Sequence, residues 1–174
     1  MSTALELRSV YKRFFAGAGA CLASAAVLRG VDLVLDMGES IAIVGPAGVG
    51  KSTLMLCSAG LLKVESGILE WFGDTSPATA ARRAHYYYSP ADLLCGHSRD
   101  EPQLHLLDLH PSFGTSASFG AWIDDRCAHG DSVIVAAREE RFVCHSVNRV
   151  LTLSGGILRS RRPMHSRVAE CATG

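Results

Sequence analysis

The chain has 174 residues, of which 48% are hydrophobic and 20% charged, a composition that excludes the intrinsically disordered class and supports a folded core. Lysine plus arginine equals aspartate plus glutamate at 17 each, so the net charge indicates neither nucleic acid nor another charged partner. The six cysteines form no C-x-x-C pair, which argues against a metal cluster and fits a reducing compartment.

The N-terminal part predicts two strands separated by a short apolar segment. Residues Leu5–Val10 and Val31–Leu35 alternate between apolar and polar side chains, as half-buried strands do. We interpret Ala16–Leu28 between them as a loop or a short helix, because its residues are small and it is too short to cross a bilayer. Charged residues interrupt the beginning of the chain, so we expect neither a signal peptide nor a transmembrane segment.

The rest of the chain alternates between strand and helix patterns. Ser40–Val44 is an almost continuous apolar run, typical of a strand buried on both faces. The further predicted elements are a helix at Lys51–Leu62 and strands at Ile68–Phe72, Tyr86–Tyr88 and Leu104–Asp108, then a helix at Ala117–Ala128, a strand at Ser132–Ala136 and a hairpin at Arg149–Leu153 and Gly156–Leu158. This alternation predicts an α/β fold with a parallel sheet covered on both sides.

A phosphate-binding motif, G-x-x-x-x-G-K-[ST], joins the buried strand at Ser40–Val44 to the following helix. Its glycines let backbone N–H groups surround a phosphate chain, and the helix N-terminus adds positive potential. Lys51 can reach the β- and γ-phosphates, and the Ser52 hydroxyl can coordinate Mg²⁺. The alternative is a chance Gly-rich turn. The predicted ligands are ATP (or GTP) and Mg²⁺, and the predicted phosphate-binding residues are Gly45, Gly48, Val49, Gly50, Lys51, Ser52 and Thr53.

Asp108 ends an apolar strand, as a carboxylate that holds Mg²⁺ through water does in such sites. An ordinary strand-end aspartate that caps a turn is the alternative. Paired with the phosphate loop, the metal role is the interpretation we adopt.

Around the loop, the sequence resembles an ABC-transporter nucleotide-binding domain. The resemblance rests on Leu5–Phe14, Val27–Gly38, the loop itself, Gly60–Gly73 and, more loosely, Ser132–Arg159. It implies a P-loop NTPase fold with a RecA-like parallel core and a small antiparallel β-subdomain. It also implies an aromatic residue stacked on adenine, which falls at Phe14. Core packing is the alternative for Phe14, and Tyr11 and Phe15 have similar claims.

The sequence departs from this family between the loop and Asp108. The family places a glutamine loop, a helical subdomain and an LSGGQ signature there, whereas this chain has only Asp74–Pro102. Ser89 or Pro90 stands where the glutamine belongs, so we interpret the helical subdomain and the signature as missing. The LSGG at Leu153–Gly156 follows the Asp108 strand, and we interpret it as a turn in the closing hairpin.

Two further departures concern catalysis. Leu109 follows Asp108 where the family has a glutamate, and a leucine side chain can neither accept a proton nor orient water. Arg138 takes the place of the family's histidine after the third central strand. It can contact a γ-phosphate as a charged donor, or it is simply a solvated arginine at a strand end.

These observations predict a truncated ABC-type nucleotide-binding domain over residues 1–158 and a basic, disordered tail over 159–174. The main functional hypothesis is an ATP-binding, non-hydrolysing regulatory or structural subunit of a larger complex. Its partner would be an ABC-type subunit, a membrane complex or a second copy. The location would be cytoplasmic, peripheral to the inner membrane. The alternatives are an accessory ATPase subunit of an ABC membrane transporter and a nucleotide-independent protein-interaction module.

Overall fold

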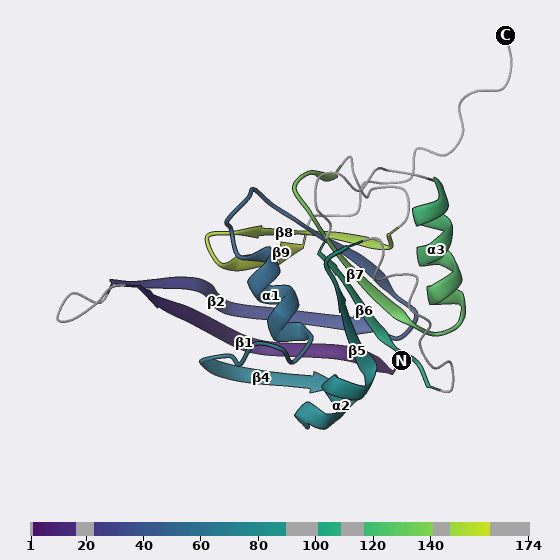
Figure 1. The fold of residues 1–174 in the computed structure, drawn as a ribbon, viewed down its shortest axis with the longest axis horizontal. Helices are drawn as coiled ribbons and strands as arrows, with labels where there is room; N and C mark the ends of the chain where they lie inside the picture. The colour runs from purple at the N-terminus through teal and green to yellow at the C-terminus, as the bar shows by residue number, and fades with distance from the viewer. Residues whose placement is uncertain (1, 17–22, 90–100, 109–116, 141–146, 161–174) are drawn as a thin grey trace, which may run out of the picture.

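The computed structural model describes residues 2–16, 23–89, 101–108, 117–140 and 147–160, which form two β-sheets and three helices (Figure 1). The smaller sheet is antiparallel. It consists of β1 (Thr3–Ala16), β2 (Ala23–Asp36) and β4 (Ser66–Trp71) in the order β2-β1-β4. This sheet confirms the predicted antiparallel β-subdomain.

The interpretation of Ala16–Leu28 as a loop or short helix is wrong at Ala16, which ends β1, and from Ala23 onward, where the residues belong to β2. Arg13 pairs with Ala26 and Phe14 with Ala25, so the strand continues along β1 through the small residues. Cross-strand hydrogen bonding here overrides the weak strand preference of alanine, which no local pattern could indicate.

The larger sheet has six strands in the order β5-β6-β7-β3-β8-β9. All neighbouring pairs are parallel except β8 with β9. This arrangement confirms the predicted parallel core and the closing hairpin. The strands are β3 (Ser40–Val44), β5 (Ala84–Tyr87), β6 (Leu104–Asp108), β7 (Ser132–Ala137), β8 (Arg149–Ser154) and β9 (Ile157–Ser160).

The helices match the prediction in two of three cases. Helix α1 (Lys51–Ser58) begins at the predicted residue but ends four residues before Leu62, and α3 (Ala117–Ala128) has the predicted bounds. Helix α2 (Pro77–Arg83) was not predicted, although Ser76 accepts a hydrogen bond from the Ala78 N–H and Pro77 occupies the first turn. That capping pattern is a recognisable helix start. In the described part of the chain no helix is long and apolar enough to span a bilayer.

The six-stranded sheet is covered on both faces, as predicted. Along β3, Ile41 and Ile43 pack in a cluster with Leu54 of α1, whereas Ala42 and Val44 pack in a second cluster with Ile123 of α3. The same alternation runs through β6 and β7. Figure 1 shows α1 beside the antiparallel sheet and α3 on the other side of the large sheet. The period-2 geometry of a strand explains why one apolar run serves both faces.

The LSGG sequence is a hairpin turn. Ser154 pairs with Ile157 across β8 and β9, so Gly155 and Gly156 are the two-residue connection between the strands. Two glycines are favoured in such connections because the backbone there needs positive φ. The prediction that this sequence forms a turn is confirmed.

A buried polar cluster lies on the α3 face of the large sheet, where β6 and β7 begin. The fully buried His105 ring contacts the Tyr87 hydroxyl through Nδ1 at 2.8 Å and Asp131 Oδ2 through Nε2 at 3.0 Å. Asp131 Oδ1 accepts a hydrogen bond from the Gln103 N–H at 2.8 Å, and Arg126 approaches its other oxygen. The cluster therefore joins the starts of two central strands to α3.

We expect the protein to lose stability in mild acid because of this cluster. Burial lowers the pKa of His105 below its ordinary value of 6.5, although hydrogen bonding to Asp131 opposes the shift. Below about pH 6.5 the unfolded chain therefore binds a proton at His105 that the folded chain does not bind. Because of this difference, the unfolding free energy falls as the pH drops through about 6.5. Urea unfolding between about pH 5 and pH 8 measures this slope.

The control for the pH series is the exposed His129, on the loop after α3. His105→Gln should flatten the pH slope, and the same exchange at His129 controls for the substitution itself. A wild-type unfolding free energy that stays constant from about pH 8 to pH 5 would contradict the assignment.

Candidate functional site

The phosphate-loop residues connect the end of β3 to α1, at the ends of the parallel strands where ligands bind in α/β sheets. Gly45 N–H donates to the Ala137 carbonyl at 3.2 Å, which attaches the loop to β7. A Cβ on Gly45 would lie 2.6 Å from the Leu153 carbonyl oxygen, so the backbones of β3 and β8 approach too closely for any side chain. The first residue of the loop is therefore held from both sides by neighbouring strands.

The middle of the loop is open. A Cβ on Gly48 would meet nothing within 4 Å, and the neighbouring residues Pro46 and Ala47 are exposed. Beyond it, α1 begins directly, because the Leu54 N–H donates to the Gly50 carbonyl at 2.9 Å. The loop is thus a cradle with free space over its backbone, which fits a phosphate chain.

Lys51 reaches back over this loop. Its ammonium donates to the carbonyl oxygens of Gly45 at 2.7 Å and Pro46 at 2.8 Å. Burial lowers the pKa of Lys51, the Asp108 carboxylate raises it and the Arg138 guanidinium lowers it further. The fold therefore brings Lys51, Asp108 and Arg138 from three distant segments into one electrostatic environment.

The remaining loop residues occupy the first turn of α1 and the approach to it. Ser52 is exposed at the helix start, so its hydroxyl is accessible, and Thr53 is half-buried. Val49 packs against the hydrophobic core beneath the loop, which anchors the segment. The exposed Ser52 hydroxyl and the Asp108 carboxylate are oxygen donors of the kind that Mg²⁺ prefers, so the donor set fits the predicted metal.

Asp108 ends β6 next to the edge strand β5, and Tyr86 of β5 contacts it. The Tyr86 hydroxyl donates to Asp108 Oδ2 at 2.9 Å, and burial, reinforced by this hydrogen bond, raises the pKa of Tyr86 well above its ordinary range. The sequence placed Tyr86 only within a strand. The contact depends on the parallel register of β5 and β6, which local sequence does not encode.

Arg138 follows β7 directly, and its side chain is exposed. Ala136, two residues earlier, pairs with Asp108 across β6 and β7, so both groups lie at the same edge of the sheet. Contact between Arg138 and a γ-phosphate stays a prediction.

Phe14 lies near the far end of β1, with 43% of its surface exposed and the Lys12 ammonium 5.2 Å from its ring centroid. Such exposure speaks against core packing, and adenine stacking stays a prediction. Phe15 is more exposed than Phe14. The Tyr11 ring lies against Gly30, where an added Cβ would be 2.8 Å from the Tyr11 hydroxyl. A β2 residue, Val27, approaches a Cβ built on Gly50 to 2.6 Å, which links this hairpin to the loop.

Several predicted features fall outside the described residues. These are Leu109, Pro90 and most of the 159–174 tail, although Arg159 and Ser160 belong to β9. In the segment Asp74–Pro102 the structure describes α2, β5 and the short stretches beside them.

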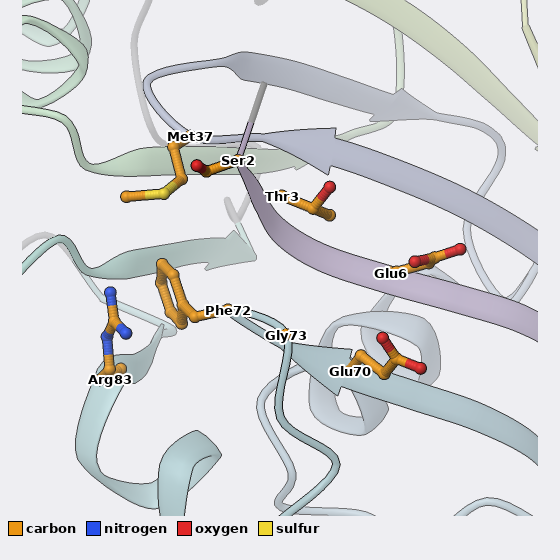
Figure 2. A pocket seen from close by; sticks show the side chains of 8 residues that line it. All are labelled: Ser2, Thr3, Glu6, Met37, Glu70, Phe72, Gly73 and Arg83. Atoms are coloured by element: carbon orange, nitrogen blue, oxygen red, sulfur yellow. The ribbon is translucent and has the colours of Figure 1, made fainter.

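A cavity of about 460 Å³ lies away from the phosphate loop, between the antiparallel sheet and α2 (Figure 2). Its charged side chains are bonded within the chain: Glu6 and Glu70 both pair with Arg8, and Arg83 donates to the Pro102 carbonyl. Figure 2 shows Arg83 beside Phe72, whose ring centroid lies 3.3 Å from the guanidinium carbon. These internal contacts account for the charged residues that line the cavity. We therefore assign the candidate functional site to the phosphate loop.

The family model and the similar proteins agree on one family. The model of the ABC transporter family matches residues 28–159. A hemin import ATP-binding protein of Nocardia farcinica is 34% identical over 134 residues, which cover 75% of this chain and 43% of that protein. A cytochrome c biogenesis ATP-binding export protein of Paramagnetospirillum magneticum is 29% identical over 147 residues, covering 83% and 60%. The chain thus spans less than two thirds of the length of these relatives.

Solved structures share the fold. The cbiO1 protein of Clostridium perfringens, part of an ABC transporter complex, superposes with a TM-score of 0.67 at 15% identity, covering 91% of this chain and 87% of that one. A nucleotide-free ATP-binding cassette from an ABC transporter gives a TM-score of 0.67 at 13% identity, covering 91% and 92%. At these identities the likeness establishes the α/β P-loop NTPase architecture.

Proposed function

Because this chain belongs to the ABC transporter family, we propose that it is an accessory ATP-binding subunit of an ABC-type assembly. The observation that carries the proposal is the Lys51 ammonium folded back onto the open loop, with Asp108 and Arg138 at the same edge of the large sheet. Two cations and one carboxylate beside an open Gly-rich backbone suit a nucleoside triphosphate with its metal.

Each residue has a defined role in this proposal. The backbone N–H groups from Gly48 to Thr53 bind the phosphate chain, while Gly45, whose N–H donates to Ala137, fixes the start of the loop. Lys51 exchanges its loop carbonyls for the β- and γ-phosphate oxygens. Ser52 and Asp108 hold Mg²⁺, which neutralises charge on the phosphates when bound. Arg138 contacts the γ-phosphate and Phe14 stacks on adenine.

We further propose that turnover is slow. Leu109 follows Asp108 in the sequence, and a leucine side chain supplies no general base. Loss of such a base costs roughly 10²–10⁴-fold in rate, or about 3–5 kcal/mol of barrier. Nucleotide binding does not depend on that group, so affinity survives. A non-hydrolysing regulatory or structural role is thus the finer form of the proposal, while the transporter relatives support the accessory ATPase alternative more directly.

The same departures indicate the kind of partner. In ABC-type proteins the phosphate loop of one subunit faces the LSGGQ signature of another. The Asp74–Pro102 segment contains no LSGGQ sequence, so a site of this kind on this chain needs a partner that supplies one. We propose an ABC-type subunit with a complete signature as that partner, rather than a second copy of this chain. Such pairing would place residues 1–158 on the cytoplasmic side of a membrane assembly.

Titration with MgATP tests the binding proposal. We expect Lys51→Ala to weaken binding by about 10–100-fold, because a charge-assisted hydrogen bond contributes roughly 1.5–3 kcal/mol. Lys63→Ala is the matched control, since Lys63 is an exposed lysine in the turn after α1. Equal and negligible binding by wild type and Lys51→Ala would remove the proposal and favour a nucleotide-independent interaction module.

Phosphate release in the same samples separates the two forms of the proposal. We expect wild type to release phosphate no faster than Lys51→Ala. Release well above that control would establish the accessory ATPase alternative and contradict the non-hydrolysing role.

A further inference from the structure

The hydrogen bond between Tyr86 and Asp108 links the edge strand of the large sheet to the proposed metal carboxylate. Across β5 and β6, Tyr86 pairs with Leu106, so its ring extends along the sheet to the residue two positions further on. Its hydroxyl meets Asp108 Oδ2 at 2.9 Å, and both side chains are half-buried. A contact of this length at partial burial is a well-formed hydrogen bond to a charged acceptor.

We propose that Tyr86 is a positioning residue for magnesium: by engaging one oxygen of Asp108, it holds the carboxylate in the orientation that receives the metal hydration shell. This inference rests on the proposed function, because it concerns the same nucleotide site. Asp108 pairs with Ala136 of β7, which in turn pairs with Ile43 of β3, two residues before Gly45, so the carboxylate lies at the loop edge of the sheet. Tyr86 approaches from β5 and engages Oδ2.

The physical basis is the orientation of a ligand by its outer-shell partner. A carboxylate at a strand end can rotate about its side-chain torsions, and a hydrogen bond to one oxygen restricts that rotation. Tyr86 comes from a strand that is hydrogen-bonded to β6 along its length, so the donor is itself held rigidly. The Asp108 side chain is therefore already ordered before the metal binds, and its other oxygen, Oδ1, can face the metal hydration shell without a further loss of conformational entropy.

The neighbouring Tyr87 provides a matched control. Its hydroxyl also makes a hydrogen bond at 2.8 Å, but to His105 in the cluster on the α3 face. The two tyrosines alternate across the same strand, so each Tyr→Phe variant removes one hydroxyl oxygen from β5. The Tyr86 hydroxyl contacts Asp108, and the Tyr87 hydroxyl contacts His105.

The test measures ATP affinity with Mg²⁺ and with EDTA for wild type, Tyr86→Phe and Tyr87→Phe, together with the melting temperature of each protein. We expect wild type to bind more tightly with Mg²⁺. In Tyr86→Phe, the ratio of ATP affinity with Mg²⁺ to ATP affinity with EDTA should be about 10-fold smaller than in wild type. The reason is that deleting an outer-shell partner typically lowers metal affinity by 10–100-fold. The affinity of this variant in EDTA should be unchanged. Tyr87→Phe should keep the wild-type ratio even though its melting temperature falls.

Three results would overturn the inference, and they are distinguishable. An unchanged magnesium ratio in Tyr86→Phe would show that Asp108 needs no positioning. An equal loss with Mg²⁺ and with EDTA would assign Tyr86 a merely structural role. If wild type binds no nucleotide in either buffer, the proposed function fails as well, and with it the premise of this inference.

Discussion

Gly45→Ala is expected to destabilise the protein by about 3 kcal/mol, because overpacking typically costs about 1–3 kcal/mol and occasionally more. It should also abolish nucleotide binding, because the displaced residue begins the phosphate loop. The added methyl group would lie 2.6 Å from the Leu153 carbonyl oxygen and 3.1 Å from Val49 Cγ1. The carbonyl belongs to β8, whose pairing with β3 runs to Val44, so neither backbone can withdraw without breaking the ladder. The strain falls on the loop that binds the phosphates.

Urea unfolding and MgATP titration measure the two effects of Gly45→Ala. Gly48→Ala is the matched control, since a methyl group there meets nothing within 4 Å and costs only the strain of its positive φ, about 1–2 kcal/mol. A Gly45→Ala protein as stable as Gly48→Ala, with wild-type affinity, would show that the β3–β8 approach is looser than the geometry indicates.

Asp131→Ala is expected to cost about 3–5 kcal/mol of unfolding free energy, because each buried donor that loses its charged acceptor costs about 1–3 kcal/mol. Asp131 accepts from the Gln103 N–H and contacts His105, and Arg126 lies 3.7 Å from it. Its loss would leave the Gln103 N–H and the His105 ring without this acceptor, and Arg126 without its ionic partner. Binding of ATP should be nearly unchanged below the new melting temperature, because the cluster lies at the strand ends opposite the loop.

The control for this prediction is Asp125→Ala on α3. Asp125 lies 3.6 Å from His129, with both side chains about half exposed, and such surface pairs contribute roughly 0–1 kcal/mol. Urea unfolding of both variants gives the comparison. If the two substitutions cost the same, the buried cluster does not stabilise the sheet as argued.

Much of the architecture could be predicted from local patterns. The runs Ser40–Val44 and Leu104–Asp108 have the bounds of β3 and β6, and Ala117–Ala128 those of α3, because buried strands and helix periodicity leave clear signatures. The misreading of Ala23–Leu28 and the overlooked α2 have opposite causes. The first is strand pairing that exceeds local propensity. The second is a helix too short for a clear hydrophobic period, marked locally only by the capping residues Ser76 and Pro77.

The amino-acid sequence alone determined the phosphate loop and the departures beside it, because the chemistry of Lys51, Ser52 and Leu109 is carried by residue type and short spacing. Folding alone brought Asp108 and Arg138 to Lys51, set Tyr86 on Asp108 and buried His105 against Asp131. These contacts join residues distant in the chain through the lateral order of parallel strands. That order arises from packing of the whole sheet, so no short segment contains it.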